Sequence, residues 1–341
     1  METGKLPPGI LGRLLQGIPI ADDRVLIRPD IGEDAALIDY GDHILIAKSD
    51  PITFASDLIG WYVVQVNAND IAAMGGIPKW FLCTLLLPET ISEAEIKEIF
   101  SQLVSACTAI DVTLVGGHTE VTSRVDVPIA VGFMLGEVEK GKQVLSSGAE
   151  IGDSIILSKG VAIEGTAVLA REDEKALLLQ GMSPSSVHKA KNFLFDPGIS
   201  VLKEVTLLQN EVEIHAMHDP TEGGIATGLQ EIGFASRVGM EIKSEQICVF
   251  QETRDICSIL NLDPLGLLAS GALIIVVPEE QTEKALAILR EGQIDACNIG
   301  RIVPQSKGLL MTNKVGLLEN IPTFRRDEIA RYFAEQTSFG H

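Results

Sequence analysis

Four acidic positions interrupt otherwise apolar stretches of the sequence. Asp34 precedes one predicted strand, in "GEDAALI", and Asp50 ends its hairpin partner, in "IAKSDP", so the open ends of two antiparallel strands can bring them close together. Asp70 lies three residues after Asn67 in "NANDIAAMGG", where the two share a helix face, and Asp219 follows in "MHDPTEGG". Because Mg²⁺ prefers oxygen ligands, these aspartates predict a magnesium site.

Each of these residues also has a purely structural interpretation. Asp34 and Asp50 could shape turns, Asn67 could be a solvated helix residue, and Asp219 could cap a turn or helix. That interpretation suits any one aspartate well. It explains four of them beside glycines or at strand ends less well, so the metal hypothesis is preferred for the set.

The glycines of "HDPTEGG" predict a second kind of site. Gly223 and Gly224 stand at the start of a predicted helix, whose unpaired N–H groups attract anions. Asp219 would repel such an anion unless a cation lay between them, which favours a metal–phosphate complex. Lys5 is a further candidate phosphate contact, or simply a solvated lysine. The alternative for the glycines is ordinary turn chemistry.

Two histidines are candidate proton carriers. In "LVGGHTEV", Gly116 and Gly117 lie at the C-terminal end of a predicted strand and would present His118 and Thr119 to a ligand, unless the segment is an ordinary turn. His218 could act as a general acid or base beside Asp219. The alternative for His218, which we prefer, is a hydrogen bond to a neighbouring loop.

Composition narrows the class of ligand. The net charge is -20, from 47 acidic and 27 basic residues, which makes nucleic acid and anionic membranes poor partners. A nucleotide stays plausible if divalent cations screen its phosphates. The five cysteines show no zinc-site spacing, and no apolar run approaches the length of a membrane span. We therefore expect a cytoplasmic protein.

Alternating strand and helix patterns predict an α/β (α+β) protein with two domains. We expect an arm with a short helix over 1–30, an N-terminal domain over 31–148, a C-terminal domain over 149–310 and a tail with a helix over 311–341. The first domain should contain a hairpin over 35–50, helices over 58–74 and 92–110, and strands over 80–88, 112–117 and 127–138. In the second half we expect strands within 146–160 and over 212–217, 238–242, 271–277 and 297–303. We expect helices there over 165–179, 199–208 and 282–291, after residue 224 and near 252–260. Ser92 and Glu95 form a predicted capping box. Walker, GxGxxG and GxSxG motifs are all missing.

Five motifs, "GEDAA", "SDP", "NDIAAMGG", "GGHTE" and "HDPTEGG", resemble in their order the superfamily of aminoimidazole-ribonucleotide (AIR) synthetase, HypE, selenophosphate synthetase and thiamine-monophosphate kinase. The resemblance spans roughly residues 5–305 and is greatest to HypE-like, AIR-synthase-related proteins. It implies a two-domain PurM-like fold, a homodimer formed through the N-terminal sheets, and an ATP–Mg²⁺ site in the cleft between the domains. It matches metal-side or phosphate-side positions to Asp34, Asp50, Asp70 and Asp219, and nucleotide-side positions to Asn69, Gly116, Gly117, Gly223 and Gly224.

Departures from the family pattern limit the expected reaction. HypE proteins end in Pro-Arg-Ile-Cys, whereas this chain ends "AEQTSFGH", so the HypE reaction is not expected by its known route. The reactive N-terminal Cys or Sec of selenophosphate synthetase has no counterpart before Cys83, and Glu222 stands where HypE-like proteins have arginine.

Three hypotheses follow for the activity. The first is an ATP-dependent enzyme that phosphorylates or activates a carbonyl or amide-type oxygen of a small substrate. The second is a HypE-like ATP-binding maturation or regulatory factor, with a protein partner and without catalysis of its own. The third is a structural dimer with a degenerate site. Substrate-dependent ATP turnover separates the first from the second, and Mg²⁺-dependent nucleotide binding separates both from the third.

Overall fold

The computed structural model describes residue 6, residues 8–29, residue 32, and residues 34–53, 57–313 and 315–339. Lys5, the candidate phosphate contact, lies outside the described residues. The chain divides into two compact units. The N-terminal unit holds the described residues of 20–28 and 34–143, and the C-terminal unit holds those of 144–339, 6–19 and 29–32.

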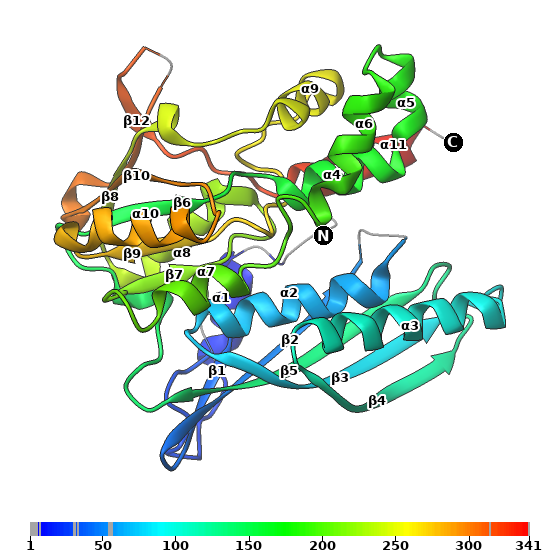
Figure 1. The fold of residues 1–341 in the computed structure, drawn as a ribbon, viewed down its shortest axis with the longest axis horizontal. Helices are drawn as coiled ribbons and strands as arrows, with labels where there is room; N and C mark the ends of the chain where they lie inside the picture. The colour runs from blue at the N-terminus through cyan, green and yellow to red at the C-terminus, as the bar shows by residue number, and fades with distance from the viewer. Residues whose placement is uncertain are drawn as a thin grey trace. The chain divides into compact units, whose positions relative to one another are not determined.

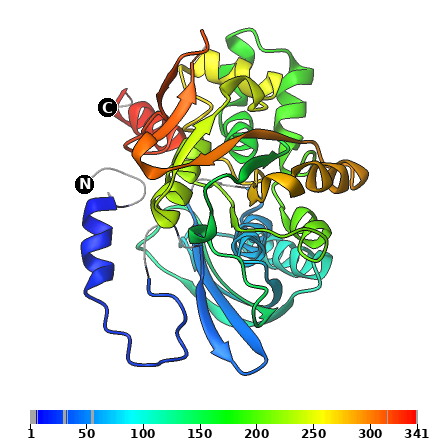
Figure 2. The same ribbon diagram turned by 90° about the vertical axis from the view of Figure 1, so that its left-hand side faces the viewer.

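A five-stranded mixed sheet forms the frame of the N-terminal unit, in the order β1-β2-β5-β3-β4. Among the described strands of this sheet, β3 and β4 pair in parallel and the other neighbours pair antiparallel. The predicted hairpin is confirmed: β1 and β2 pair from Ala36 opposite Ala47 to Tyr40 opposite His43, and Figure 2 shows them as a long blue ribbon. The strands are β1 Ala36–Tyr40, β2 His43–Ile52, β3 Ile77–Leu87, β4 Thr113–Val121 and β5 Ile129–Glu139.

Two helices cover one face of this sheet, α2 (Ile59–Ala73) and α3 (Glu93–Ala109), as Figure 1 shows. Both were predicted. Helix α2 is apolar nearly all round and almost entirely buried, and it ends where Gly75 takes a left-handed φ of 75°. The predicted capping box of α3 is present, with the Glu95 N–H donating to Ser92 Oγ at 3.2 Å and the Ser92 N–H to Glu95 Oε2 at 2.8 Å.

Strand β4 is longer than the sequence predicted. We expected a strand over 112–117 followed by a turn, but Thr113–Val121 is continuous strand, so His118 and Thr119 lie within it. Gly117 pairs with Cys83 of β3, and a Cβ at Gly117 would collide with the Cys83 backbone. These glycines therefore do not end the strand. At Gly117 the missing side chain lets β4 approach β3 closely.

A seven-stranded sheet organises the C-terminal unit, in the order β12-β11-β8-β10-β6-β9-β7. In the described part of this sheet, β8 and β11 pair in parallel and the other neighbours pair antiparallel. The strands predicted at β6 and β8 to β10 are confirmed. The strand predicted over 212–217 is shorter and begins only at Ala216, and β11 and β12 were missed. The strands are β6 Ser154–Ser158, β7 Ala216–His218, β8 Gly239–Ile242, β9 Ile274–Val277, β10 Ala296–Val303, β11 Leu309–Thr312 and β12 Leu318–Asn320.

The helices of this unit differ from the prediction at two places. The predicted helical stretch over 165–179 is broken at Asp173 into α4 and α5, and α6 was missed although Ser183 caps it and Pro184 begins it. The helices are α1 Pro8–Gln16, α4 Ile163–Glu172, α5 Glu174–Leu179, α6 Pro184–Lys191, α7 Leu202–Leu208, α8 Gly224–Ser236, α9 Gln251–Leu260, α10 Thr282–Glu291 and α11 Glu328–Phe339. Within the described part of the chain, no helix is both long and apolar enough to cross a membrane.

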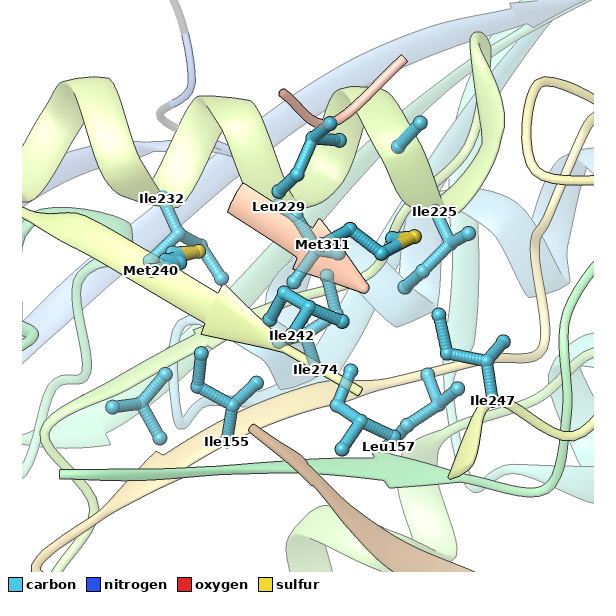
Figure 3. Packing of buried hydrophobic residues seen from close by; sticks show 14 of the residues in the cluster. Ile155, Leu157, Ile225, Leu229, Ile232, Met240, Ile242, Ile247, Ile274 and Met311 are labelled. Atoms are coloured by element: carbon cyan, nitrogen blue, oxygen red, sulfur yellow. The ribbon is translucent and has the colours of Figure 1, made fainter. Parts of the chain in front are cut away.

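The core of the C-terminal unit holds α8 against the sheet. Ile225, Leu229 and Ile232 recur at helical spacing on one face of α8 and are fully buried. Figure 3 shows them packed with side chains of several strands, including Ile242 and Ile274. Burying each such side chain contributes about 1.5–3 kcal/mol, so this contact fixes the position of the "HDPTEGG" segment that leads into α8.

Candidate functional site

Three of the predicted carboxylates gather around a lysine in the N-terminal unit. Every second side chain of β2 points to the sheet face that α2 covers, because side chains alternate along a strand. These are residues 44, 46, 48, 50 and 52, and the isoleucines among them are buried. Lys48 Nζ lies 2.9 Å from Asp70 Oδ1 on α2 and 3.3 Å from Asp50 Oδ2 on β2. Asp34, just before β1, also acts on the Lys48 charge. The structure thus brings Asp34, Asp50 and Asp70 to one place.

These charges set the protonation state of the lysine. Burial lowers the pKa of Lys48, but the charges of Asp70, Asp50 and Asp34 outweigh that effect and leave the pKa raised above its ordinary value. The side chain is 19% exposed, and that of Asp70 is 6% exposed. Lys48 therefore stays positively charged inside a group of carboxylates, a feature that the sequence analysis missed.

Asn67 holds the Asp50 backbone in place. Its Oδ1 accepts the Asp50 N–H at 2.9 Å, and its Nδ2 donates to the carbonyl oxygens of Asp50 at 3.2 Å and Val63 at 2.8 Å. It is fully buried, so the interpretation of Asn67 as a solvated helix residue is wrong. A Cβ at Gly132 of β5 would collide with the Asn67 amide, so this glycine makes the close approach of α2 to the sheet possible. Asn69, the predicted nucleotide contact, is also fully buried in α2.

The "GGHTE" segment lies away from these carboxylates. Asp50 is opposite Gly132, Gly132 is opposite Cys83, and Cys83 is opposite Gly117, so Asp50 and Gly117 are three strands apart, or about 14 Å. Gly116, Gly117, His118 and Thr119 instead line a cavity of about 350 Å³ that also touches α3. The His118 side chain is 64% exposed, with Nε2 3.1 Å from Glu120 Oε2.

In the C-terminal unit, His218 ends β7 and Asp219 follows it, and both are buried. His218 Nε2 lies 2.9 Å from Glu231 Oε2 on α8. The alternative role for His218 was a hydrogen bond to a neighbouring loop, and this contact is a similar one to a neighbouring helix.

The start of α8 already binds a carboxyl group of the same chain. Gly223 donates its N–H to Asp327 Oδ2 at 2.7 Å, and Asp327 Oδ1 accepts the N–H of Ile329 at 2.8 Å. Gly223 and Gly224 have φ values of 84° and 67°, and a Cβ at Gly224 would collide with the Leu265 carbonyl. The backbone path therefore requires both glycines. The sequence predicted a helix in the tail but not where it begins, and only the structure shows that Asp327 directly precedes α11.

Two buried carboxyls of this unit titrate near neutrality. Burial raises the pKa of Glu164 on α4 to about 7; the Ser270 hydroxyl opposes the rise, and the charges of Asp327 and Glu222 add to it. Glu164 Oε2 and Ser270 Oγ nonetheless lack a hydrogen bond of normal geometry among the described residues. Burial also raises the pKa of Asp327 to about 7, against the N–H groups of Gly223 and Ile329. Neither residue was identified from the sequence.

The donor set of the N-terminal unit suits a hard cation. Asp34, Asp50 and Asp70 come from separate elements and offer only oxygen, as Mg²⁺ sites do. Each unit has its own mixed sheet and its own buried carboxylates, and together they define a two-domain α/β protein with the PurM-like fold.

The chain belongs to the AIR synthase related protein family. The model of the family's N-terminal domain matches residues 32–138, and that of its C-terminal domain matches residues 150–311.

Several proteins similar to this chain are named for roles in hydrogenase formation or maturation. A hydrogenase expression/formation protein of Methanocaldococcus jannaschii is 30% identical over 294 residues, covering 83% of this chain and 83% of its own. The carbamoyl dehydratase HypE of Rhizobium leguminosarum is 27% identical, over 86% of this chain and 83% of its own. A solved structure of HypE in complex with ATP superposes with a TM-score of 0.73 at 24% identity, covering 96% of this chain and 98% of that one.

Proposed function

We propose that this protein binds ATP with Mg²⁺ and uses it to phosphorylate or activate a carbonyl or amide-type oxygen of a small substrate. The observation that carries the proposal is the convergence of Asp34, Asp50 and Asp70 on one cationic centre in the N-terminal unit. The similarity to a carbamoyl dehydratase and to a fold that binds ATP in HypE supports it.

Bound Mg²⁺ would supply charge neutralisation at the phosphates. Asp34, Asp50 and Asp70 would hold the ion, Asp219 is a further ligand candidate, and Asn67 would keep Asp50 in register through its two backbone hydrogen bonds. Gly116, Gly117 and Thr119 line the cavity beside β4 and are candidates for the nucleoside end. His118 is the exposed candidate for proton transfer.

We also propose that two copies pair through the N-terminal sheets. On β3 and β5 the side chains that point away from α2 and α3 include Trp80, Leu82 and Phe133, and Leu82 lies opposite Phe133. Trp80 is 36% exposed and Phe133 is 40% exposed. An apolar sheet face of this kind is typical of a protein–protein interface.

Calorimetric titration with ATP, with and without Mg²⁺, tests the binding proposal. Asp50→Asn and Asp219→Asn keep side-chain shape and remove a charge, so each should weaken Mg²⁺–ATP binding by about tenfold or more, about 1.4 kcal/mol. Asp39→Asn is the matched control, because Asp39 lies on the same hairpin but pairs at the surface with Lys140. Absence of Mg²⁺-dependent binding by the wild-type protein would refute the proposal.

The alternative is an ATP-binding maturation factor without its own catalysis, which the hydrogenase-formation relatives favour. A phosphate-release assay on the same samples separates the two. Turnover that rises with an added amide or carbamoyl compound supports the enzyme. Tight Mg²⁺–ATP binding with no turnover under any of these conditions supports the maturation factor.

A further inference from the structure

Lys48 stands where a metal ion would be expected. Its ammonium group bridges Asp70 Oδ1 on α2 and Asp50 Oδ2 on β2, at 2.9 Å and 3.3 Å. We infer that Lys48 is a tethered cation that competes with the divalent ion for these carboxylates, so that the metal enters together with a phosphate-bearing ligand. This inference rests on the proposed function.

The geometry makes the two cations mutually exclusive in this position. Mg²⁺ needs its oxygen ligands at about 2.0–2.1 Å, so an ion that bound both oxygens would lie between them, as the ammonium does. The metal ion and the Lys48 ammonium group would then be in contact and would repel each other strongly. Water screens this repulsion little, because the Asp70 side chain is only 6% exposed. Binding of the metal therefore requires Lys48 Nζ to move.

The side chain is built to move without leaving the site. Lys48 is anchored on β2 next to buried Ile46, whereas its four-carbon stem is flexible and its ammonium is a compact charge with three donors. Phosphate oxygens of a nucleotide offer that ammonium a new partner. A ligand carrying both metal and phosphate thus satisfies the carboxylates and the lysine together, while a free metal ion leaves the ammonium displaced.

An ordinary surface ion pair of the same unit shows the contrast. Lys140 pairs with the single carboxylate of Asp39, and the Lys140 side chain is 56% exposed. Loss of such a pair changes stability by about 0–1 kcal/mol and has no reason to affect metal binding. Lys48, by contrast, contacts two candidate metal ligands from different elements.

The test is Mn²⁺ binding in the absence of nucleotide, followed by electron paramagnetic resonance. Lys48→Met replaces the lysine by an unbranched side chain that is one atom shorter and uncharged, and Lys140→Met is the matched control. We expect Lys48→Met to bind Mn²⁺ about tenfold more tightly than the wild-type protein, and Lys140→Met to bind it as the wild type does. A merely structural role for Lys48 predicts weaker metal binding instead, because the site would be disordered.

A second readout covers the folding of the variant. Without metal, Lys48→Met should melt at a lower temperature than the wild type, and Mn²⁺ should raise its melting temperature by more than it raises that of the wild type. Lys48→Gln serves in the same assays if Lys48→Met does not fold.

The inference that Lys48 competes with the metal is refuted if a folded Lys48 variant binds Mn²⁺ no more tightly than the wild type does. If the wild type still binds Mg²⁺–ATP, the proposed function is unaffected by that result. Failure of the wild type to bind Mg²⁺–ATP overturns both.

Discussion

The buried carboxyl of Glu164 makes the stability of the C-terminal unit dependent on pH in a direction that can be worked out. Its pKa rises from 4.5 to about 7, because burial penalises the charged form. At about 1.4 kcal/mol for each pKa unit, ionising this carboxyl in the folded protein costs about 3 kcal/mol. Because the pKa is raised in the folded state, the contribution of Glu164 to the unfolding free energy is fully present below about pH 4.5. This contribution is lost as the pH rises through about 7.

Glu164→Gln removes that dependence while keeping the shape of the side chain. We expect the unfolding free energy of the variant, relative to the wild type, to increase by roughly 2–3 kcal/mol between pH 5 and pH 8. Urea unfolding of both proteins at several pH values measures this difference, and the pH effects of groups that do not interact with Glu164 cancel in it. Glu252→Gln is a matched control, because Glu252 is also a buried helix glutamate but is paired with Lys189 at 2.7 Å.

The reasoning has one clear failure. If the difference between Glu164→Gln and the wild type is the same at pH 5 and pH 8, the carboxyl does not ionise in a desolvated environment. Such a result would mean that water or a cation reaches Glu164 in the folded protein.

Two further substitutions test how the N-terminal unit is held together. Ser92→Ala removes the capping box of α3 and should cost about 1 kcal/mol in urea unfolding, and no loss would show that the exposed cap contributes nothing. Asn67→Ala leaves the partly buried N–H and carbonyl oxygen of Asp50 without their side-chain partner, so a loss of about 2–4 kcal/mol is expected. Asn67→Ala should also weaken Mg²⁺–ATP binding under conditions where the protein is folded. Unchanged affinity would show that Asn67 does not position Asp50 for binding.

Sequence periodicity was sufficient for the elements whose ends carry local signals. The β1–β2 hairpin, the glycine at the end of α2 and the capping box of α3 each depend on residues within a few positions of one another. The gathering of Asp34, Asp50 and Asp70 followed from hairpin geometry and one helix face. Strand β4 was predicted too short because glycines usually end strands, and only its pairing with Cys83 shows why Gly117 does not.

The features that sequence reasoning missed are long-range. Lys48 belongs to no recognised motif, and only the packing of α2 on β2 places Asp70 beside it. The raised pKa of Glu164 depends on its burial and on Asp327 and Glu222, which are far along the chain. A local sequence pattern cannot predict these contacts, because each arises from the tertiary packing of separate elements.

The bond between Gly223 and Asp327 has a consequence for how the protein is made. The two residues are 104 positions apart, so the turn before α8 leaves the ribosome long before its partner does. At about 5–20 residues per second, that interval is roughly 5–20 s. During this time the N–H of Gly223 can only be satisfied by water or a transient partner. One end of α8 is thus completed only when synthesis reaches the last helix, and a nascent chain stalled before Asp327 would carry a C-terminal unit whose "HDPTEGG" turn lacks its anchor.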